Sequence, residues 1–419
     1  MSRRSEAALS VPGESSPGSG SSAPLAIALI ALLAVFVPVL LQSALFLLGI
    51  SLTSLTFVCG LVLGLACPLF VLRSGRSLAI AYAVVLVTVV IAGMIQGTSW
   101  DNAHDSLTYH EPAAITIADG ANPITSDLGH ILAEHYPKAA WVFSAGMYAI
   151  TGNLESGKLI NVLLLLVSLG VALTVLTAVP GLPRPFAYTL SALLALSPVV
   201  VMQIDTHYVD GLFASLGTVL VLLALAEDAE LLTAKTLEGR AIWVIVAASA
   251  VLLANLKFTG LVFVIALVAL HVLRTRMRSS GHRTARVSKI PLLLTCVGVG
   301  ILIVGFDPYV TNTLQNGHPF YPVFGAEETV MRDAPDSSQR PVAYRGTPAP
   351  LAFAMSLAER TAGGAPEEMS QRFELKNPLS VHRSEIAALT LPDPRTGGFG
   401  PLFLLSLVLA GLIGVYIGF

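Results

Sequence analysis

The chain has 419 residues, of which 54% are hydrophobic and 12% are charged, and its mean hydropathy is +0.75. This composition excludes a soluble domain of the same length and indicates an integral membrane protein. The formal net charge of −2 and the lack of a basic stripe argue against a nucleic-acid partner, so we expect membrane lipid and polar small molecules as partners.

The first segment, 1–23, is rich in Ser, Gly and Pro, and we expect a disordered cytoplasmic tail there. After it, apolar runs of about 17 to 25 residues predict membrane-spanning helices. These runs lie at 24–42, 46–72, 77–96, 156–179, 186–203, 209–226, 241–254, 258–273, 290–306 and 401–419. The predicted fold class is therefore all-α: a polytopic transmembrane helix bundle of about ten spans, with a core at 24–306, a large extracytoplasmic loop at 307–400 and a last span at 401–419.

The distribution of basic residues predicts the orientation, because Lys and Arg are retained on the cytoplasmic side of a membrane. With the amino terminus inside, most basic residues fall in cytoplasmic connections, and the short outer connections carry only Lys138, Lys158 and Lys257. This path places the loop 97–138, the turn from Asp205 to Asp210 and the loop 307–400 on the extracytoplasmic face of a cell membrane.

The loop 97–138, here called the first polar loop, is rich in acidic residues and histidines. Ionisable side chains are costly beside a bilayer, so their concentration predicts a functional site. They are Asp101, His104, Asp105, His110, Glu111, Asp119, Asp127, His130, Glu134 and His135. Pro112 suits the first turn of a helix and the Asn122-Pro123 pair suits an end, so we expect short interfacial helices in the loop rather than a further span.

Six short strings carry a resemblance to a known family. They are DSLTYHEP from Asp105, HYPK from His135, DTHYVD from Asp205, NLKFT from Asn255, NGHPFYP from Asn316 and RTGGFG from Arg395. In order, spacing and predicted topology, the chain resembles the GT-C superfamily of integral membrane glycosyltransferases over nearly its whole length from Trp100 onward. The resemblance implies an acidic first outer loop, interfacial helices, a multi-helix bundle and a sugar donor linked to a polyprenyl phosphate or diphosphate.

Two features depart from the pattern of that superfamily. Many members carry adjacent or once-separated acidic residues in the first outer loop, whereas Asp101 and Asp105 are four positions apart. Members also usually continue with further helices beyond the point that corresponds to Phe419. We therefore expect either that the chain continues past Phe419 or that the catalytic core is compact.

Asp105 is the predicted catalytic base, because sugar transfer to a hydroxyl requires a group that takes up the proton and Asp105 precedes the Tyr-His-x-Pro string. Asp101 would lie one turn away on the same helical face and could assist, or share an Mg²⁺ or Mn²⁺ ion with Asp105. The alternatives are that Asp105 only caps a helical turn and that Asp101 is an exposed loop acid.

A second set of residues could bind the donor and its phosphate. Hydrogen-bond donors and cations suit a lipid-borne phosphate, and Lys257 interrupts a long apolar stretch. The set is Tyr109, His110, His135, Tyr136, Lys138, Lys257 and Arg395. The alternatives are packing roles for the histidines, and interfacial lysines and an arginine that reach lipid headgroups.

A third set could bind sugar hydroxyls or line a subsite with aromatic rings. It comprises Asp205, His207, Asp210, Asn316, His318 and Tyr321. The three residues in the DTHYVD string could instead bind Mg²⁺ or Mn²⁺, or form only a polar turn. The NGHPFYP string is equally consistent with an interfacial aromatic anchor.

Together these patterns predict a glycosyltransferase that moves a sugar from a polyprenyl-phosphate-linked donor to a glycan, lipid or protein acceptor on the extracytoplasmic face, with inversion at the anomeric carbon. Three alternatives remain. The chain could be a transporter or flippase of lipid-linked sugars, a ligase or polymerase that uses a lipid-diphosphate glycan, or a structural bundle. A transporter predicts internal repeats and charge pairs near the bilayer midplane, and beyond Lys257 the sequence has no such pair.

Overall fold

The computed structural model describes residues 23–72, 75–228, 231, 237–277, 290–325, 344–360, 373–391, 400 and 402–416. Within these residues the secondary structure is helical, apart from one isolated bridge between Glu359 and Leu375. The all-α class is therefore confirmed for this part of the chain. The predicted tail lies outside the described residues except for Ala23, where the first helix begins, and Arg395 lies outside them too.

Six helices of the described residues are long and apolar enough to cross a membrane, so the chain is a multi-pass membrane protein. They include α1 (Ala23–Leu47), α2 (Ser54–Val71), α3 (Gly75–Gln96), α7 (Leu159–Thr177), α10 (Asp210–Asp228) and α11 (Leu237–Leu256). A seventh candidate is bent by 84°: α14 (Ile290–Ile303) is followed by the π-helix η3 (Phe306–Val310) and by α15 (Thr311–Asn316).

The predicted number of ten spans is not confirmed by the described residues. The run 186–203 forms two short helices, α8 (Arg184–Ala195) and α9 (Pro198–Gln203), because Pro198 cannot donate a backbone hydrogen bond and begins a new helix. The apolar part of α12 (Phe258–Met277) is shorter than the six long helices, and α21 (Phe403–Tyr416) has 14 residues. The start of the predicted loop 307–400 is helical, since it contains η3 and α15.

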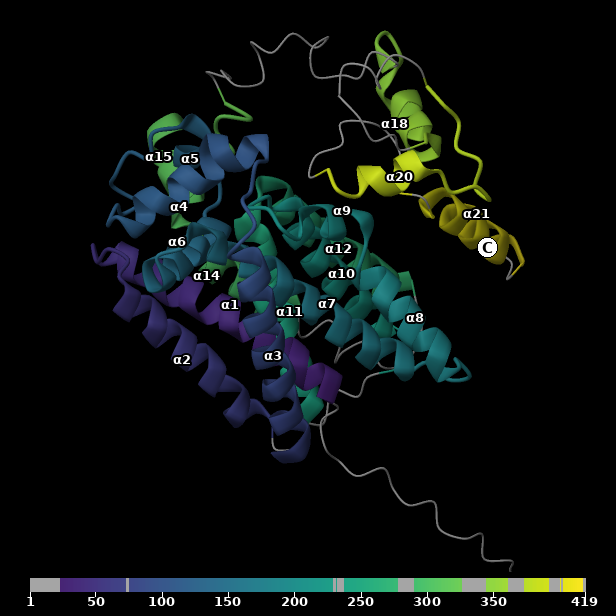
Figure 1. Cartoon of the computed structure of the whole chain (residues 1–419), viewed down its shortest axis with the longest axis horizontal. Coiled ribbons are helices and arrows are strands. Elements are labelled where there is room, and N and C mark those ends of the chain that lie inside the picture. Colours follow the sequence, from purple (N-terminus) through teal and green to yellow (C-terminus); the bar gives the residue numbers. More distant parts are fainter. Residues whose placement is uncertain are drawn as a thin grey trace, which may run out of the picture.

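Helix α1 is the centre of the bundle and packs against α2, α3, α7 and α11 (Figure 1). It is apolar on all sides, which is typical of a fully buried helix. Two glycines of its neighbours allow close backbone contact with it. A Cβ atom at Gly64 of α2 would lie 2.4 Å from the carbonyl oxygen of Leu33, and one at Gly170 of α7 would lie 2.5 Å from that of Pro24.

A first prediction concerns this close packing. We expect Gly64→Ala to destabilise the protein by about 1–3 kcal/mol, because the added methyl group overlaps the backbone of α1 and the two helices must move apart. Thermal unfolding of the detergent-solubilised protein measures the effect. Gly298→Ala is the matched control, since a Cβ atom at this helical position meets no atom within 4 Å; an equal loss in both variants would contradict the packing argument.

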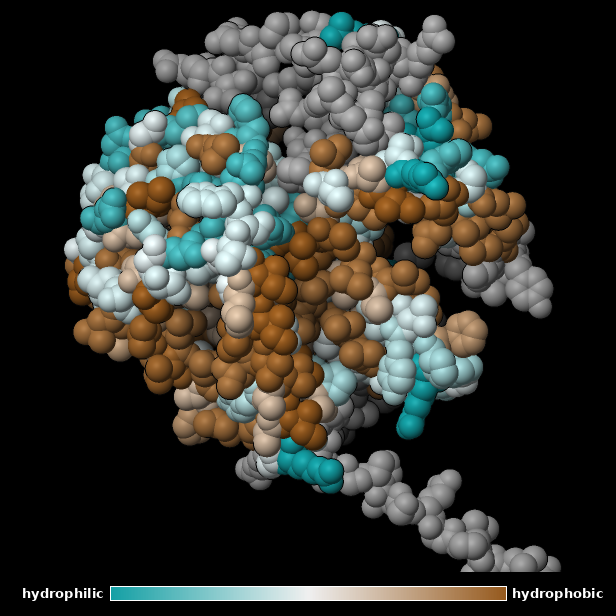
Figure 2. Space-filling view, viewed as in Figure 1, coloured by the Kyte–Doolittle hydropathy of each residue, from teal (hydrophilic) through white to brown (hydrophobic). Residues whose placement is uncertain are grey.

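Helices α2 and α3 present large apolar side chains to the outside. Leu63 and Phe70 of α2 and Leu86 and Met94 of α3 are exposed. Figure 2 shows hydrophobic residues over these two helices and hydrophilic residues over the end of the bundle where α4 and α5 lie. Exposed apolar surface of this extent is expected where a helix faces lipid hydrocarbon rather than water.

Short helices form the polar end of the bundle, as the sequence predicted for the first polar loop (Figure 1). They are the π-helix η1 (Ser106–His110), α4 (Glu111–Ala118), α5 (Ile131–His135), α6 (Ala139–Thr151) and the 3₁₀-helix η2 (Leu154–Lys158). Pro112 lies in the first turn of α4, and α6 ends at Gly152 in a left-handed conformation that favours glycine. The part of 344–391 that is described contains α18 (Ala349–Ala358) and α20 (Arg383–Ala388).

Candidate active site

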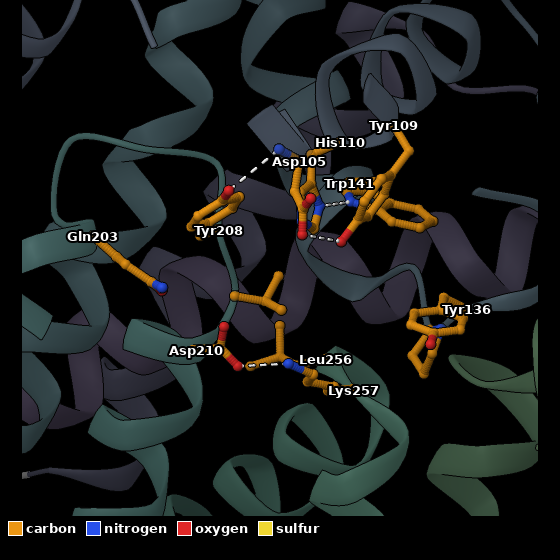
Figure 3. Close-up of a pocket in the computed structure, with 12 residues that line it drawn as sticks. Asp105, Tyr109, His110, Tyr136, Trp141, Gln203, Tyr208, Asp210, Leu256 and Lys257 are labelled. Atoms are coloured by element: carbon orange, nitrogen blue, oxygen red, sulfur yellow. Dashed lines mark hydrogen bonds and ion pairs between the residues drawn. The ribbon is translucent and has the colours of Figure 1, made fainter. Parts of the chain in front are cut away.

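A pocket of about 250 Å³ lies where the first polar loop meets the ends of three membrane helices (Figure 3). Its walls come from η1, from the segment between α5 and α6, from α6, from the α9–α10 connection and from the break between α11 and α12. The lining residues are Asp105, Tyr109, His110, Tyr136, Pro137, Trp141, Gln203, Tyr208, Val209, Asp210, Leu256 and Lys257. Six residues that the sequence put forward as separate candidates therefore share one pocket.

Asp105 precedes η1, but its side chain makes no capping hydrogen bond to that helix. Its Oδ2 atom accepts a hydrogen bond from the hydroxyl of Tyr109 at 3.1 Å, and its backbone N–H donates to the hydroxyl oxygen of Tyr208 at 3.2 Å. The side chain of Asp105 is 40% exposed. The Asp105 carboxylate therefore does not cap the turn that it precedes. It remains accessible from the pocket.

Burial determines the protonation states of Tyr109 and His110, the last two residues of η1. The pKa of Tyr109 is raised far above its usual range by burial and by the charge of Asp105, so its hydroxyl keeps the proton that it donates. Burial lowers the pKa of His110 to about 3, so the imidazole is neutral at neutral pH. The indole N–H of Trp141 donates to Nδ1 of His110 at 2.6 Å, which places the imidazole proton on Nε2.

Lys257 occupies the break between α11 and α12. Its ammonium is 2.6 Å from Oδ1 of Asp210, the first residue of α10, and both side chains are partly exposed. Figure 3 draws this ion pair and the Asp105–Tyr109 hydrogen bond as two distinct pairs within the pocket. The pocket therefore carries an accessible carboxylate, which can accept a proton, and an accessible ammonium, which can bind an anionic group.

Lys138 lies outside the lining of this pocket. It is 2% exposed, and its ammonium donates to the carbonyl oxygens of Glu134 at 2.8 Å and Tyr136 at 3.0 Å and forms an ion pair with Asp307 at 2.5 Å. An ammonium has three hydrogens, and these contacts use all of them. The contacts leave no hydrogen for the donor phosphate that the sequence assigned to Lys138; the residue instead joins the first polar loop to η3.

Four of the other predicted donor and substrate residues lie outside the lining of the pocket. His135 Nδ1 lies 2.8 Å from Oδ1 of Asn312, whose amide donates to the carbonyl oxygen of Tyr321 at 2.9 Å. The ring of His318 packs against Phe320. Neither these residues nor Asn316 line the pocket: His135, His318 and Tyr321 are all absent from its walls. Tyr136 does line it, and its ring packs against Phe258 with centroids 5.1 Å apart.

Asp101 and His207 lie in a second, buried group rather than beside Asp105. Asp101 is 4% exposed; its Oδ2 accepts the backbone N–H of His207 at 2.6 Å and its Oδ1 accepts that of Ala103 at 2.9 Å. Ligand atoms of Asp101, Glu111 and His207 lie within 4.8 Å of one another. Asp105 is not a member of this group of three among the described residues.

Lys158 forms a third group beside it. This residue is 0% exposed, and its ammonium contacts Glu155 at 2.8 Å, Asp205 at 2.7 Å and the carbonyl oxygen of Ser99 at 2.7 Å. The hydroxyl of Ser99 donates to the other carboxylate oxygen of Asp205. Asp205, predicted to bind sugar hydroxyls, thus belongs to an ion-pair network that joins η2 to the first polar loop and to the α9–α10 connection.

Sequence reasoning missed several residues of these groups. Tyr208 stands inside the DTHYVD string, and Lys158 is an ionisable residue at the start of an apolar run, so both carried a signal. Glu111 was visible only as one acid among many. Trp141 and Gln203 carried no signal, because an indole or amide in an apolar helix reads as packing until the neighbouring chain is in place.

Comparisons of the chain with protein-family models, with curated proteins and with solved structures found no match.

Proposed function

We propose that the protein is an integral membrane glycosyltransferase that moves a sugar from a polyprenyl-phosphate-linked donor to a glycan, lipid or protein acceptor. The observation that carries the proposal is the pocket itself, in which the Asp105 carboxylate and the Lys257 ammonium are both accessible at the polar end of an apolar helix bundle. The GT-C resemblance of the first polar loop and of the Asn255-Leu-Lys257 string supports it. In this proposal the pocket faces the extracytoplasmic side.

Asp105 and Lys257 have distinct roles in the proposed reaction. Asp105 takes the proton of the acceptor hydroxyl as the hydroxyl oxygen attacks the anomeric carbon. The bond between that carbon and the phosphate oxygen breaks, and the polyprenyl phosphate leaves with the bonding electrons. The Lys257 ammonium leaves the Asp210 carboxylate and binds the phosphate of the donor. There it stabilises the negative charge that develops on the leaving phosphate. Attack from the face opposite the leaving group inverts the configuration at the anomeric carbon.

The aromatic walls suit a sugar. The aromatic side chains of Tyr109, Tyr136, Trp141 and Tyr208 line the pocket, and the three tyrosines carry hydroxyl groups. His110, held neutral with its proton on Nε2, can donate to a sugar hydroxyl without adding a positive charge near Lys257. The apolar surfaces of the neighbouring helices suit a polyprenyl chain, which remains in the hydrocarbon layer.

Transfer from a panel of radiolabelled polyprenyl-phosphate sugars, and from lipid-diphosphate glycans, tests this proposal with the purified protein in lipid nanodiscs. Turnover of a monosaccharide donor to polyprenyl phosphate, with an acceptor-dependent product, is the expected result. Turnover of a lipid-diphosphate glycan alone would make the protein a ligase or polymerase. Binding of donors with movement across the membrane and no bond cleavage would make it a transporter or flippase.

A second prediction concerns Lys257. We expect Lys257→Gln to lower kcat/KM for the lipid-phosphate donor by about 10- to 100-fold, since a charged hydrogen bond contributes roughly 1.5–3 kcal/mol and each 1.4 kcal/mol is a factor of ten. Lys257→Arg keeps the positive charge and is expected to lose less. Steady-state kinetics on both variants measure the difference, and equal losses in the two would show that Lys257 acts through packing rather than through its charge.

A further inference from the structure

The three residues Asp101, Glu111 and His207, here called the buried triad, lie outside the lining of the pocket. They come from three places in the chain: the segment before η1, the first residue of α4 and the connection between α9 and α10. One ligand atom from each lies within 4.8 Å of the other two. The fold thus brings two carboxylates and an imidazole together from separate segments.

Two of the three side chains end in an atom without a partner. Oε1 of Glu111 and Nε2 of His207 are buried and have no hydrogen-bond partner among the described residues. His207 is only 8% exposed. Buried polar atoms are nearly always hydrogen-bonded, because an unsatisfied one loses its interaction with water and gains nothing. An imidazole nitrogen and a carboxylate oxygen left open side by side are what a bound cation would complete.

The carboxylates of the buried triad also favour a bound cation. The Lys158 ammonium forms ion pairs with Glu155 and Asp205, and no ion pair joins Asp101 or Glu111 to a cation among the described residues. A buried carboxylate such as that of Asp101, which is 4% exposed, is costly unless it is paired or binds a metal.

We propose that the buried triad binds one divalent transition-metal ion, Mn²⁺ or Zn²⁺, through a carboxylate oxygen of Asp101, a carboxylate oxygen of Glu111 and an imidazole nitrogen of His207. Two carboxylates balance the charge of such an ion, and an imidazole nitrogen favours a transition metal over Mg²⁺. Ligands at about 2.0–2.2 Å from an ion lie at most about 4.4 Å apart. Ligands in a tetrahedral arrangement at these distances lie about 3.3–3.6 Å apart, so any of the three atoms that lie farther apart than this within the triad would move closer on binding.

Asp101 can serve as a ligand although it already accepts two backbone hydrogen bonds. An ionised carboxylate offers about four lone-pair sites, and the bonds from His207 and Ala103 use two of them. These bonds orient the carboxylate before the metal arrives. Oriented carboxylates of this kind raise metal affinity because less side-chain freedom is lost on binding.

The ion has a positioning role rather than a catalytic one. His207 is adjacent in sequence to Tyr208, and Glu111 is adjacent to His110, and both neighbours line the pocket. A metal held by the triad ties the first polar loop to the α9–α10 connection and so fixes the Tyr208 hydroxyl that accepts the backbone N–H of Asp105. This role does not depend on the reaction proposed above, because it concerns the wall of the pocket and not its chemistry.

Metal content and metal titration of the full chain test the proposal. The protein is purified in detergent, analysed by elemental mass spectrometry, stripped with a chelator and titrated with Mn²⁺, Zn²⁺ and Mg²⁺ by calorimetry, with melting temperature as a second readout. We expect about one Mn²⁺ or Zn²⁺ per chain and a higher melting temperature on binding. Glu111→Gln and His207→Gln should each weaken binding by at least about 100-fold, since the loss of an outer-sphere partner alone costs 10- to 100-fold.

Asp119→Asn is the control, because Asp119 is an exposed acid at the end of α4 and lies outside the triad. It should bind the metal as the wild type does. Glu111→Gln keeps the shape of the side chain and removes one buried charge, so it should remain folded. Absence of Mn²⁺ and Zn²⁺ binding by the wild type, or equal binding by all three variants, would overturn the proposal. Binding of Mg²⁺ as tight as that of Mn²⁺ and Zn²⁺ would also overturn it.

Discussion

Asp105→Asn is expected to lower sugar transfer by about 10²- to 10⁴-fold while the protein stays folded. This is the range over which a positioned general base contributes to a reaction. An amide has the size of the carboxylate and can still accept the hydroxyl proton of Tyr109 in a hydrogen bond, so the wall of the pocket should keep its form. An amide cannot take up the proton of an acceptor hydroxyl, so the chemical step should fail. Single-turnover transfer from a radiolabelled donor measures the loss.

Two further variants separate catalysis from position. Tyr109→Phe removes the hydroxyl that orients Asp105 and should cost less than Asp105→Asn, because the base itself remains. His104→Gln removes an exposed neighbour whose Nδ1 lies 3.4 Å from Oδ1 of Asp105, and it should change activity little. Donor binding by Asp105→Asn should match that of the wild type. If Asp105→Asn transfers sugar at half the wild-type rate or more, Asp105 is not the base.

The helices that the sequence predicted well are those whose apolar pattern is uninterrupted. Runs such as 24–42, 77–96 and 156–179 appear as long helices, because a stretch of apolar residues in a membrane chain has no competing structure. The prediction of a single span at 186–203 is not confirmed, because Ser197-Pro198 divides this run and Pro198 starts a second helix. The bend of 84° after Ile303 lies where the predicted span ends, and the helix beyond it contains polar residues that resemble a loop.

The candidate site was predictable only in part. Asp105, Asp210 and Lys257 could be selected because ionisable residues are rare in an apolar chain, and all three line one pocket. Lys138 was selected by the same rule, yet its partner Asp307 lies far along the chain and buries it. Local sequence holds no signal for a pairing of that kind. The triad of Asp101, Glu111 and His207 was missed for the same reason, since only the folded chain brings its members together.

Lys158→Met is expected to produce the largest loss of stability. Lys158 is fully buried, and its ammonium contacts Glu155, Asp205 and the carbonyl oxygen of Ser99. Removal of one partner from a buried ion pair typically costs about 3–5 kcal/mol, because the other charge stays buried without compensation. Asp205 is partly exposed and recovers some hydration, so most of the cost comes from the Glu155 carboxylate, which stays buried without a partner. The expected fall in melting temperature is about 5 °C or more.

The double variant Lys158→Met with Glu155→Gln identifies the cause. If the loss comes from an unpaired buried carboxylate, neutralising Glu155 should restore a large part of the stability, because the double variant no longer buries the Glu155 charge without a partner. Glu155→Gln alone should destabilise less than Lys158→Met, since it leaves Asp205 to pair with Lys158. Melting of all four proteins, with aggregation followed by size-exclusion chromatography, completes the cycle. A double variant that is no more stable than Lys158→Met would mean that the packing of the lysine stem, rather than its charge, holds η2 in place.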